Sequence, residues 1–413
     1  MRRSALFLVF AIGLLLPASA QKELKTLRSY VKNGKTGDAI KEAERLAADS
    51  TWRMEPNVYA AKFQAYKQLY LAQNEKMYLK QKADTTAYFS AIHGMFASAL
   101  QCDSAERYQM REKKRKMRHR GMHTSQLAAV FPNLFSAEGY FYSHALYPQA
   151  GEAAELLFKL QGDTLFWNKG EMPQLTPLQR QLSALIHVQS HYRTKQYARM
   201  FLHAAEALSY RPAWGETMEE LAVAHQQMGD TAAYLATLQT ALDSLPTRQS
   251  LYDHIRLLCY RRADNGLLLA TARQVMAADS ARLDCRRDEL VALYHLQRHD
   301  ELITSASALL ALSPEDPLGN YYLGVCYVEK AKAVPVPVKR SSSASYRKLV
   351  AQRRAFYQQA RGPMETYRRL CPDQASHWQA PLYDIYLNLN LGKEFEEISK
   401  MEPPPRSPGG ERH

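Results

Sequence analysis

The sequence repeats a pattern of two helices and a turn at a regular interval of about 34 residues, which is typical of helical repeat arrays. Pro212 and Pro246 bound one such interval, and helical periodicity on each side of Gly229-Asp230 predicts two helices between them. A glycine suits the left-handed end of one helix, and an aspartate side chain suits the free N–H groups at the start of the next. The repeat indicates stacked helical hairpins, because a single hairpin does not bury its own apolar face.

The same pattern recurs along the chain. Asp264 follows Asp230 by the interval that separates the two prolines, Asp300 follows Asp264 by a slightly longer one, and Pro314 opens another stretch of helical spacing. Elsewhere, apolar residues at intervals of three and four predict further helix pairs. These pairs are 22–33 with 38–48, 56–80 with 85–101, 124–144 with 149–160, 177–193 with 195–209, and 376–391 with 393–401.

The repeats resemble the tetratricopeptide repeat (TPR) family. Its unit has a Leu-Gly pair and an aromatic residue in the first helix, a Gly-Asp turn, an Ala-Leu pair in the second helix and a closing proline. The matching residues are Gly229-Asp230, Ala241-Leu242 and Pro246 in one repeat, and Pro314, Leu323-Gly324 and Tyr327 in another. Ala222 and Tyr234 depart from the family pattern, which predicts altered helix packing. The resemblance implies an all-α fold, a right-handed superhelix of stacked antiparallel helix hairpins (a TPR-like α-solenoid).

Residues 1–20 have the composition of a secretory signal peptide. Arg2 and Arg3 precede an apolar run over 5–16, and small residues occupy 18–20. The run is too short to cross a bilayer as a helix, which takes about 20 residues, and no later segment is long and apolar enough. We therefore expect export into a bacterial envelope, with the periplasm as first choice and an extracellular location as second. The alternative is a buried N-terminal helix or a membrane anchor.

Three stretches interrupt the helical pattern. Residues 162–176 are predicted to link an N-terminal hairpin lobe, 21–161, to a C-terminal TPR-like lobe, 177–401. Residues 334–345, rich in proline and serine, are predicted to form an inserted loop, and 402–413 a disordered tail. Five widely spaced cysteines leave disulfide pairing open, although small buried side chains are the favoured interpretation. They are Cys102, Cys259, Cys285, Cys326 and Cys371.

No motif of a known chemistry stands out. The sequence contains no phosphate-binding loop, no dinucleotide-binding glycine motif and no nucleophile elbow. Three histidine pairs have the i, i+4 spacing that places two imidazoles on one helical face: His119/His123, His187/His191 and His295/His299. A zinc site takes three or four ligands, and the sequence offers no evident third. We therefore predict surface histidines, no metal, no cofactor and no catalytic residue, and a binding protein in place of an enzyme.

The segment 107–120 concentrates the positive charge of the chain. It holds eight basic residues and one acid, against a formal net charge of +13 for the whole sequence. One interpretation is a solvated helical extension that ends at Gly121, with Met110 and Met117 as an apolar seam. The other is contact with an acidic partner or with an anionic lipid or glycan surface. Nucleic acid is not expected, because the chain has no recognition fold and is predicted to leave the cytoplasm.

The TPR resemblance also implies where a partner would bind, since such arrays present a concave face lined by the first helix of each hairpin. Candidate residues on these helices are Glu219, Val223, Gln226, Tyr260, Tyr321 and Val325, and those of the basic segment are Arg111, Lys113, Lys114, Arg115, Lys116, Arg118 and Arg120. The sequence thus predicts an exported TPR-like scaffold that binds a protein or peptide partner in a bacterial envelope. The alternative is an envelope carrier or capture protein that holds an anionic glycan or lipid surface through residues 107–120.

Overall fold

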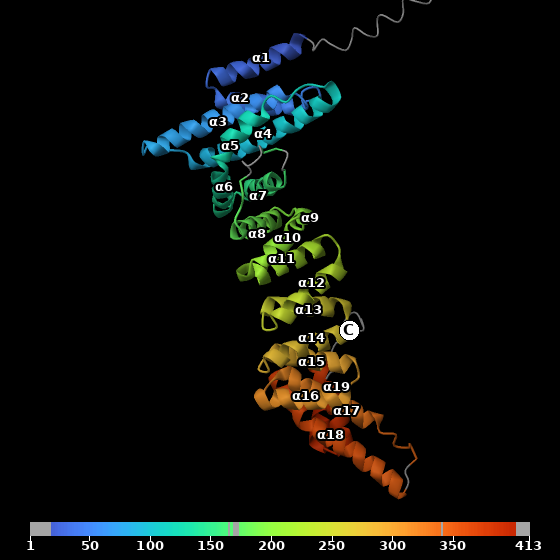
Figure 1. Ribbon diagram of the computed structural model, residues 1–413. Coiled ribbons are helices and arrows are strands. Elements are labelled where there is room, and N and C mark those ends of the chain that lie inside the picture. The colour runs from blue at the N-terminus through green and yellow to red at the C-terminus, as the bar shows by residue number, and fades with distance from the viewer. Residues whose placement is uncertain (1–17, 164–165, 168–172, 340–341, 402–413) are drawn as a thin grey trace, which may run out of the picture. The chain divides into compact units, whose positions relative to one another are not determined.

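The structure is a computed structural model that describes residues 18–163, 166–167, 173–339 and 342–401 (Figure 1). These residues form twenty α-helices and one short 3-10 helix, and no strand occurs among them. The predicted all-α class of antiparallel helix hairpins is therefore confirmed. The chain divides into two compact units, Met1–Tyr234 and Leu235–His413, and the division falls inside α12 (Thr231–Ser244).

Unit 1 is a stack of helices in which α2, α3, α4, α6, α7 and α8 each pack on a neighbour in chain order (Figure 1). Its helices are α1 (Ala18–Lys32), α2 (Thr36–Ala48), α3 (Pro56–Tyr78), α4 (Thr85–Lys113), α5 (Arg120–Ala128), α6 (Phe131–Ser143), α7 (Tyr147–Gly162), α8 (Pro177–Arg193), α9 (Tyr197–Met200), α10 (Ala204–Ser209), η1 (Arg211–Ala213) and α11 (Trp214–Gln227).

Two helices predicted as continuous in unit 1 are each divided. The predicted helix 124–144 is split into α5 and α6, and Pro132 lies in the first turn of α6, where a proline fits because that turn needs no N–H donor. The predicted helix 195–209 is split into α9 and α10. At that break the ring of His203 stacks on Phe158 of α7, with centroids 3.7 Å apart. Aromatic packing therefore fixes a bend that periodicity alone did not reveal.

Unit 2 is also a series of hairpins, in which each helix after α12 packs on the next one. Its helices after α12 are α13 (Gln249–Arg262), α14 (Asn265–Ala278), α15 (Leu283–His295), α16 (His299–Leu312), α17 (Pro317–Ala333), α18 (Ala344–Leu370), α19 (Ala375–Leu389) and α20 (Gly392–Ser399). The connection between α17 and α18 is 334–343, because the last two residues of the predicted inserted loop, 334–345, already belong to α18. The two helices of that hairpin pack together despite the insertion.

Several turns between paired helices contain a residue with a left-handed backbone conformation, and these residues recur at a regular interval. Lys195, Gly229, Ala263 and Gln297 have positive φ angles, and successive members are separated by the same interval as Pro212 and Pro246. After each of them the next N–H donates to the carbonyl oxygen five positions back, as from Arg298 to Leu293 at 3.0 Å. This is the Schellman helix end, which satisfies carbonyl groups left free by the last turn. Only one of the four positions is a glycine, so the sequence revealed only that one.

The predicted aspartate caps are confirmed at two of these turns. Asp230 accepts a hydrogen bond from the backbone N–H of Ala233 at 2.9 Å, and Asp264 accepts one from Leu267 at 3.0 Å. Asp300 does not follow the pattern, because α16 begins one residue before it and its carboxylate pairs with Lys330 at 2.5 Å. The repeat therefore keeps its backbone geometry while its capping residue changes.

The predicted linker, 162–176, is anchored to the core of unit 1 at its described positions. Phe166 and Trp167 are buried against Phe131 and Leu160, and the Trp167 indole N–H donates to the Leu160 carbonyl at 3.0 Å. Helices α7 and α8, on either side of the segment, also pack directly on each other. Unit 1 therefore continues through the predicted lobe boundary.

Residues 1–17 of the predicted signal peptide and the predicted tail, 402–413, lie outside the described residues, while Ala18–Ala20 belong to the first turn of α1. The five cysteines are unpaired, four of them are buried and Cys371 is partly exposed. Among the residues that are described, no helix combines the length and apolar character that crossing a membrane requires.

A close helix contact in unit 2 depends on Gly324 of α17, the glycine of the predicted Leu-Gly pair. A Cβ atom at this position would collide with the Met364 side chain of α18 and lie 3.3 Å from its backbone nitrogen. We expect Gly324→Ala to lower the free energy of unfolding by about 1–3 kcal/mol, as overpacking does. Chemical denaturation of the full chain measures this.

Gly139→Ala is the control for this prediction. Gly139 lies within α6, and no neighbouring group lies within 4 Å of the position that a Cβ atom would take. Alanine there is expected to leave stability unchanged or to raise it by up to about 1 kcal/mol, because alanine favours the helix over glycine. Equal destabilisation by both substitutions would contradict the close approach at Gly324.

Candidate functional site

The basic segment is not the single helix that the sequence predicted. Helix α4 continues past Asp103-Ser104 to Lys113, Lys114 takes a left-handed conformation, and α5 begins only at Arg120. Between the helices, the buried carboxylate of Glu106 accepts hydrogen bonds from the backbone N–H groups of Arg118 at 2.7 Å and His119 at 3.2 Å. These bonds hold the connection 114–119 against α4, so a loop replaces the expected end of the helix at Gly121.

The loop also separates the two methionines that were expected to form one apolar seam. Met110 is exposed on α4, whereas Met117 lies in the connection after the helix has ended. The seam prediction is therefore wrong.

Two arginines of the basic segment serve internal ion pairs. Asp103 of α4 is 2% exposed, and its carboxylate contacts Arg107 at 2.6 Å and Arg120 at 2.5 Å. Arg107 also reaches Asp163 at the end of α7, at 3.0 Å. Arg120, predicted to bind a partner, therefore holds α4 and α5 together.

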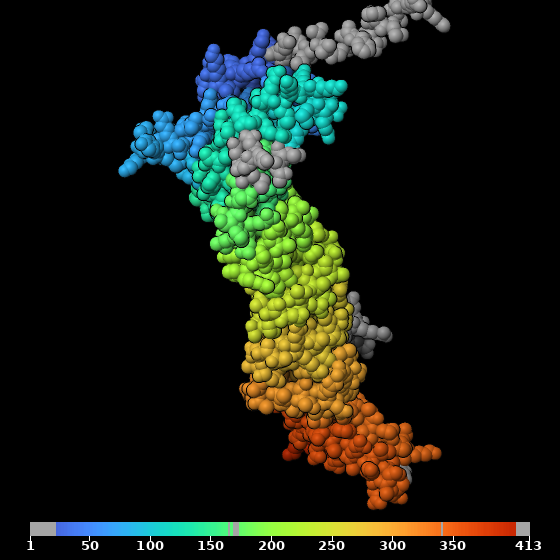
Figure 2. Space-filling model, in the orientation of Figure 1, coloured from blue at the N-terminus to red at the C-terminus, as the bar shows by residue number. Residues whose placement is uncertain are grey.

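The other predicted cations of the segment lie at the surface. Arg115 donates to the side-chain oxygen of Gln109 at 3.2 Å. The rest are exposed and form no ion pair within the described part of the chain: Arg111, Lys113, Lys114, Lys116 and Arg118. Figure 2 shows this segment, in cyan, as a projecting part of the surface of unit 1. These residues remain available to a partner.

Two adjoining hollows lie beside this connection. The first, of about 590 Å³, is lined by Arg115, Lys116, Arg118 and His119, together with Asn57 at the start of α3. The second, of about 300 Å³, shares Asn57 and His119 with the first. Its lining is more apolar and comes from α1, α3 and α5: Val31, Ala60, Ala61 and Met122, together with the cations Arg28 and Lys32. Unit 1 thus has a cationic depression beside an apolar one.

The predicted partner-binding residues on first helices differ in exposure. On α11, Glu219, Val223 and Gln226 are partly exposed. On α17, Tyr321 is partly buried and packs on Tyr367, whereas Val325 is only 8% exposed and belongs to the core of unit 2. Val325 therefore has little surface to offer a partner.

Tyr260 of α13 is exposed, but a hydrogen bond holds its hydroxyl group. The hydroxyl donates to the buried Asp288 of α15 at 2.5 Å, and Tyr252 donates to the same carboxylate at 2.6 Å. Arg256 completes the cluster at 2.7 Å from Asp288. The side chain predicted to meet a partner therefore also joins two hairpins of unit 2.

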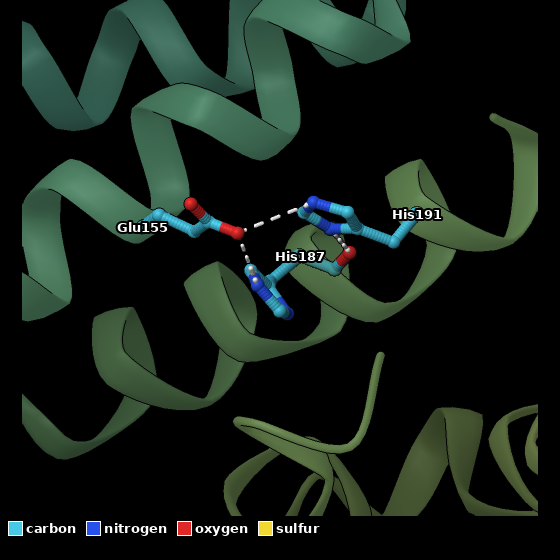
Figure 3. Close-up of side chains that lie close together, drawn as sticks. All are labelled: Glu155, His187 and His191. Atoms are coloured by element: carbon cyan, nitrogen blue, oxygen red, sulfur yellow. Dashed lines mark hydrogen bonds and ion pairs between the residues drawn. The ribbon is translucent and has the colours of Figure 1, made fainter. Parts of the chain in front are cut away.

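The sequence predicted that the histidine pairs lie at the surface, but the structure buries one of these pairs. His187 and His191 of α8 are 0% and 3% exposed, and Glu155 of α7 faces both rings (Figure 3). Burial lowers the pKa of His187 to about 3, so its ring is neutral. Because Glu155 lies far before the pair in the sequence and on another helix, spacing within one helix did not reveal it.

The second pair, His119/His123, is divided, since His123 is buried against Phe63, while His119 is half-buried beside the cationic hollow. His295, of the third pair, is exposed. His299 lies 3.2 Å from Glu329 of α17. Among the described residues, only the group on α7 and α8 gathers three side chains able to hold a metal ion.

Comparisons with known proteins give likenesses of fold. No family model matches the sequence, and no curated protein sequence matches it. Similar solved structures include the C-terminal part of a TPR repeat-containing protein from Cytophaga hutchinsonii, at 13% identity and a TM-score of 0.36 over 64% of this chain and 92% of that one. The P58(IPK) TPR domain follows at 11% identity and a TM-score of 0.25 over 93% and 100% of the chains. Another is MamA MSR-1, at 17% identity and a TM-score of 0.29 over 48% of this chain and 99% of that one.

Arg120 and Arg118 of the basic segment have different roles, and measurements of unfolding free energy can distinguish them. Arg120→Gln should lower the free energy of unfolding by about 1.5–3 kcal/mol, because the buried Asp103 loses a charged hydrogen-bond donor. Arg118→Gln should change it by less than about 0.5 kcal/mol, since only the backbone of that residue is engaged. Denaturant titration compares the two, and a reversed order would refute the assignment.

A buried carboxyl group predicts a pH dependence. Glu138 of α6 is fully buried and accepts a hydrogen bond from the Ser183 hydroxyl at 2.7 Å, and burial raises its pKa from 4.5 to about 8. The folded state therefore holds a proton that the unfolded state releases, and the free energy of unfolding falls as pH rises from about 4.5 to about 8. Glu138→Gln, which stays neutral, should gain stability relative to wild type by up to about 1.4 kcal/mol per pH unit in this window.

Unfolding of both proteins at pH 5, 6.5 and 8 measures the difference, with Glu152→Gln as control. Glu152 is exposed on α7, so its substitution should give a difference that hardly varies with pH. A flat difference for Glu138→Gln as well would show that the Glu138 side chain is ionised in the folded protein at pH 5.

Proposed function

We propose that the chain is an exported TPR-like scaffold that binds an acidic, partly apolar segment of a partner protein in a bacterial cell envelope. The observation that carries the proposal is the pair of adjoining hollows in unit 1, one cationic and one apolar. Export is supported by the charged start, short apolar run and small residues of 1–20. Arrays of helical hairpins commonly serve as binding proteins.

The charges of the first hollow favour an acidic occupant. Lys116 and Arg118 have no ion-pair partner among the described residues, whereas the one carboxylate in the lining, Glu106, is occupied by backbone N–H groups. An incoming carboxylate would therefore meet cations that are free to pair with it. Arg111, Lys113 and Lys114 lie nearby in the chain and add to the positive field that attracts such a partner.

The second hollow favours a protein segment over a purely charged surface. Val31, Ala60, Ala61 and Met122 contribute apolar surface that an acidic glycan or a lipid head group would leave uncovered. A peptide with acidic residues followed by an apolar side chain would cover both hollows. Burial of that side chain adds affinity that salt does not screen. Capture of an anionic glycan or lipid surface through 107–120 is the alternative that the experiment distinguishes.

Site-specific photo-crosslinking tests the proposal. A photoreactive residue would replace Met117 in the first hollow or Met122 in the second, and the full chain would be crosslinked in its own envelope extract. We expect a discrete protein adduct at both positions. The control position is Met77, which is exposed at the far end of α3 and lines neither hollow.

Charge reversal gives the second arm of this test. The triple change of Lys113, Lys116 and Arg118 to Glu should reduce the adduct at least about tenfold, whereas the same change at Lys76, Lys80 and Lys82, all exposed near the end of α3, should not. An adduct formed equally at Met77, or one unaffected by the first triple change, would refute the hollows as the site. Binding only to anionic vesicles or glycans, abolished by salt, would favour the alternative function.

A further inference from the structure

We propose that Glu155, His187 and His191 form a binding site for a divalent transition-metal ion, with Zn²⁺ as the best fit. The site lies in unit 1, between α7 and α8, apart from the two hollows of the proposed function. Two imidazoles and one carboxylate are a usual set of protein ligands for zinc, with a fourth position left to water or another group. In Figure 3 both rings and the carboxylate point toward one another.

The spacing of the three side chains suits a tetrahedral ion. Oε1 of Glu155 lies 3.4 Å from Nε2 of His187 and 3.3 Å from Nε2 of His191. Two ligands bound to zinc at about 2.0–2.2 Å, with a tetrahedral angle between them, are separated by about 3.4 Å. The three ligand atoms also lie within 4.8 Å of one another. One ion can therefore contact all three with little movement.

A hydrogen bond at Nδ1 of His191 leaves the electron pair of its Nε2 atom directed at the carboxylate of Glu155. Its Nδ1 lies 2.8 Å from the backbone carbonyl oxygen of His187, and since a carbonyl only accepts, Nδ1 carries the hydrogen. In the neutral ring Nε2 is then an acceptor, and it faces Oε1 of Glu155, a second acceptor. A cation between them, a metal ion or a proton, resolves this repulsion.

The surroundings hold two of the three ligands, His191 and Glu155, as metal sites usually do. The Nδ1–H bond of His191 to a backbone carbonyl fixes its ring orientation, and Arg199 binds the other oxygen of Glu155, Oε2, leaving Oε1 to face the rings. Gly151 of α7 makes room for the His191 ring, because a Cβ there would lie 2.9 Å from it. His187 differs from His191, because its Nδ1 atom has no hydrogen-bond partner in the described structure and no second bond fixes its ring.

The site is closed on one side and reachable on another. Both histidine side chains are buried, whereas the side chain of Glu155 is 25% exposed, so an ion can enter past the carboxylate. A bound ion would join α7 to α8 across the connection 162–176. It would thereby stabilise the folded chain, because the unfolded chain holds no such site.

The test uses the full chain, stripped of metal with a chelator and titrated with Co²⁺ and then Zn²⁺. We expect one ion per chain, the strong visible absorption of four-coordinate Co²⁺, and its displacement by Zn²⁺. No thiolate charge-transfer band should appear, which excludes binding by the cysteines. The midpoint of thermal unfolding should rise with Zn²⁺.

Two variants and one control decide the ligands. Glu155→Gln and His191→Gln should each weaken binding at least about tenfold and remove the thermal shift. His295→Gln, an exposed member of an i, i+4 pair in unit 2, should bind as wild type does. Circular dichroism checks that each variant is folded. If wild type binds no ion, or if the folded ligand variants bind as tightly as wild type, the proposal is overturned.

Discussion

The fold depends on burying one apolar face of each hairpin against the next, and that burial depends on how sharply the chain turns between helices. Within the hairpins α11–α12, α13–α14 and α15–α16, a left-handed residue provides the reversal. At Ala263 and Gln297 this conformation costs roughly 1–2 kcal/mol, which no glycine relieves. The packing of the paired helices must offset that cost. The interior contacts therefore impose the turn geometry, and the residue that happens to stand at the turn does not create it.

Much of the architecture was predictable because local signals agreed with the packing. Helical periodicity placed several helices near their observed bounds, among them α2, α8 and α19, and Gly229-Asp230 marked its turn correctly. Gly324 was singled out by the TPR resemblance, and in the structure it is a point of close approach to Met364. Such features are visible in sequence because a glycine, an aspartate cap or an apolar stripe acts within one turn or one hairpin.

What escaped prediction depends on contacts between distant segments. The basic segment looked like a helix until the Glu106 carboxylate, from within α4, was seen to bind the backbone of Arg118 and His119. Arg120 looked like a surface cation, because its partner Asp103 lies a helix away. Glu155 had no relation to His187 until α7 packed on α8. In each case a polar side chain forms a hydrogen bond or an ion pair with a distant segment, and no local sequence pattern predicts that interaction.

The left-handed turns have a consequence for how such a chain is recognised. Lys195, Gly229, Ala263 and Gln297 have one backbone shape at one interval but four different side chains. A comparison of amino-acid sequences finds four different residues at these positions. A comparison of backbone dihedral angles finds the same turn four times. The chain matches no family model, yet these turns keep one constant interval. Backbone torsion angles therefore identify repeats of this kind better than residue identities do.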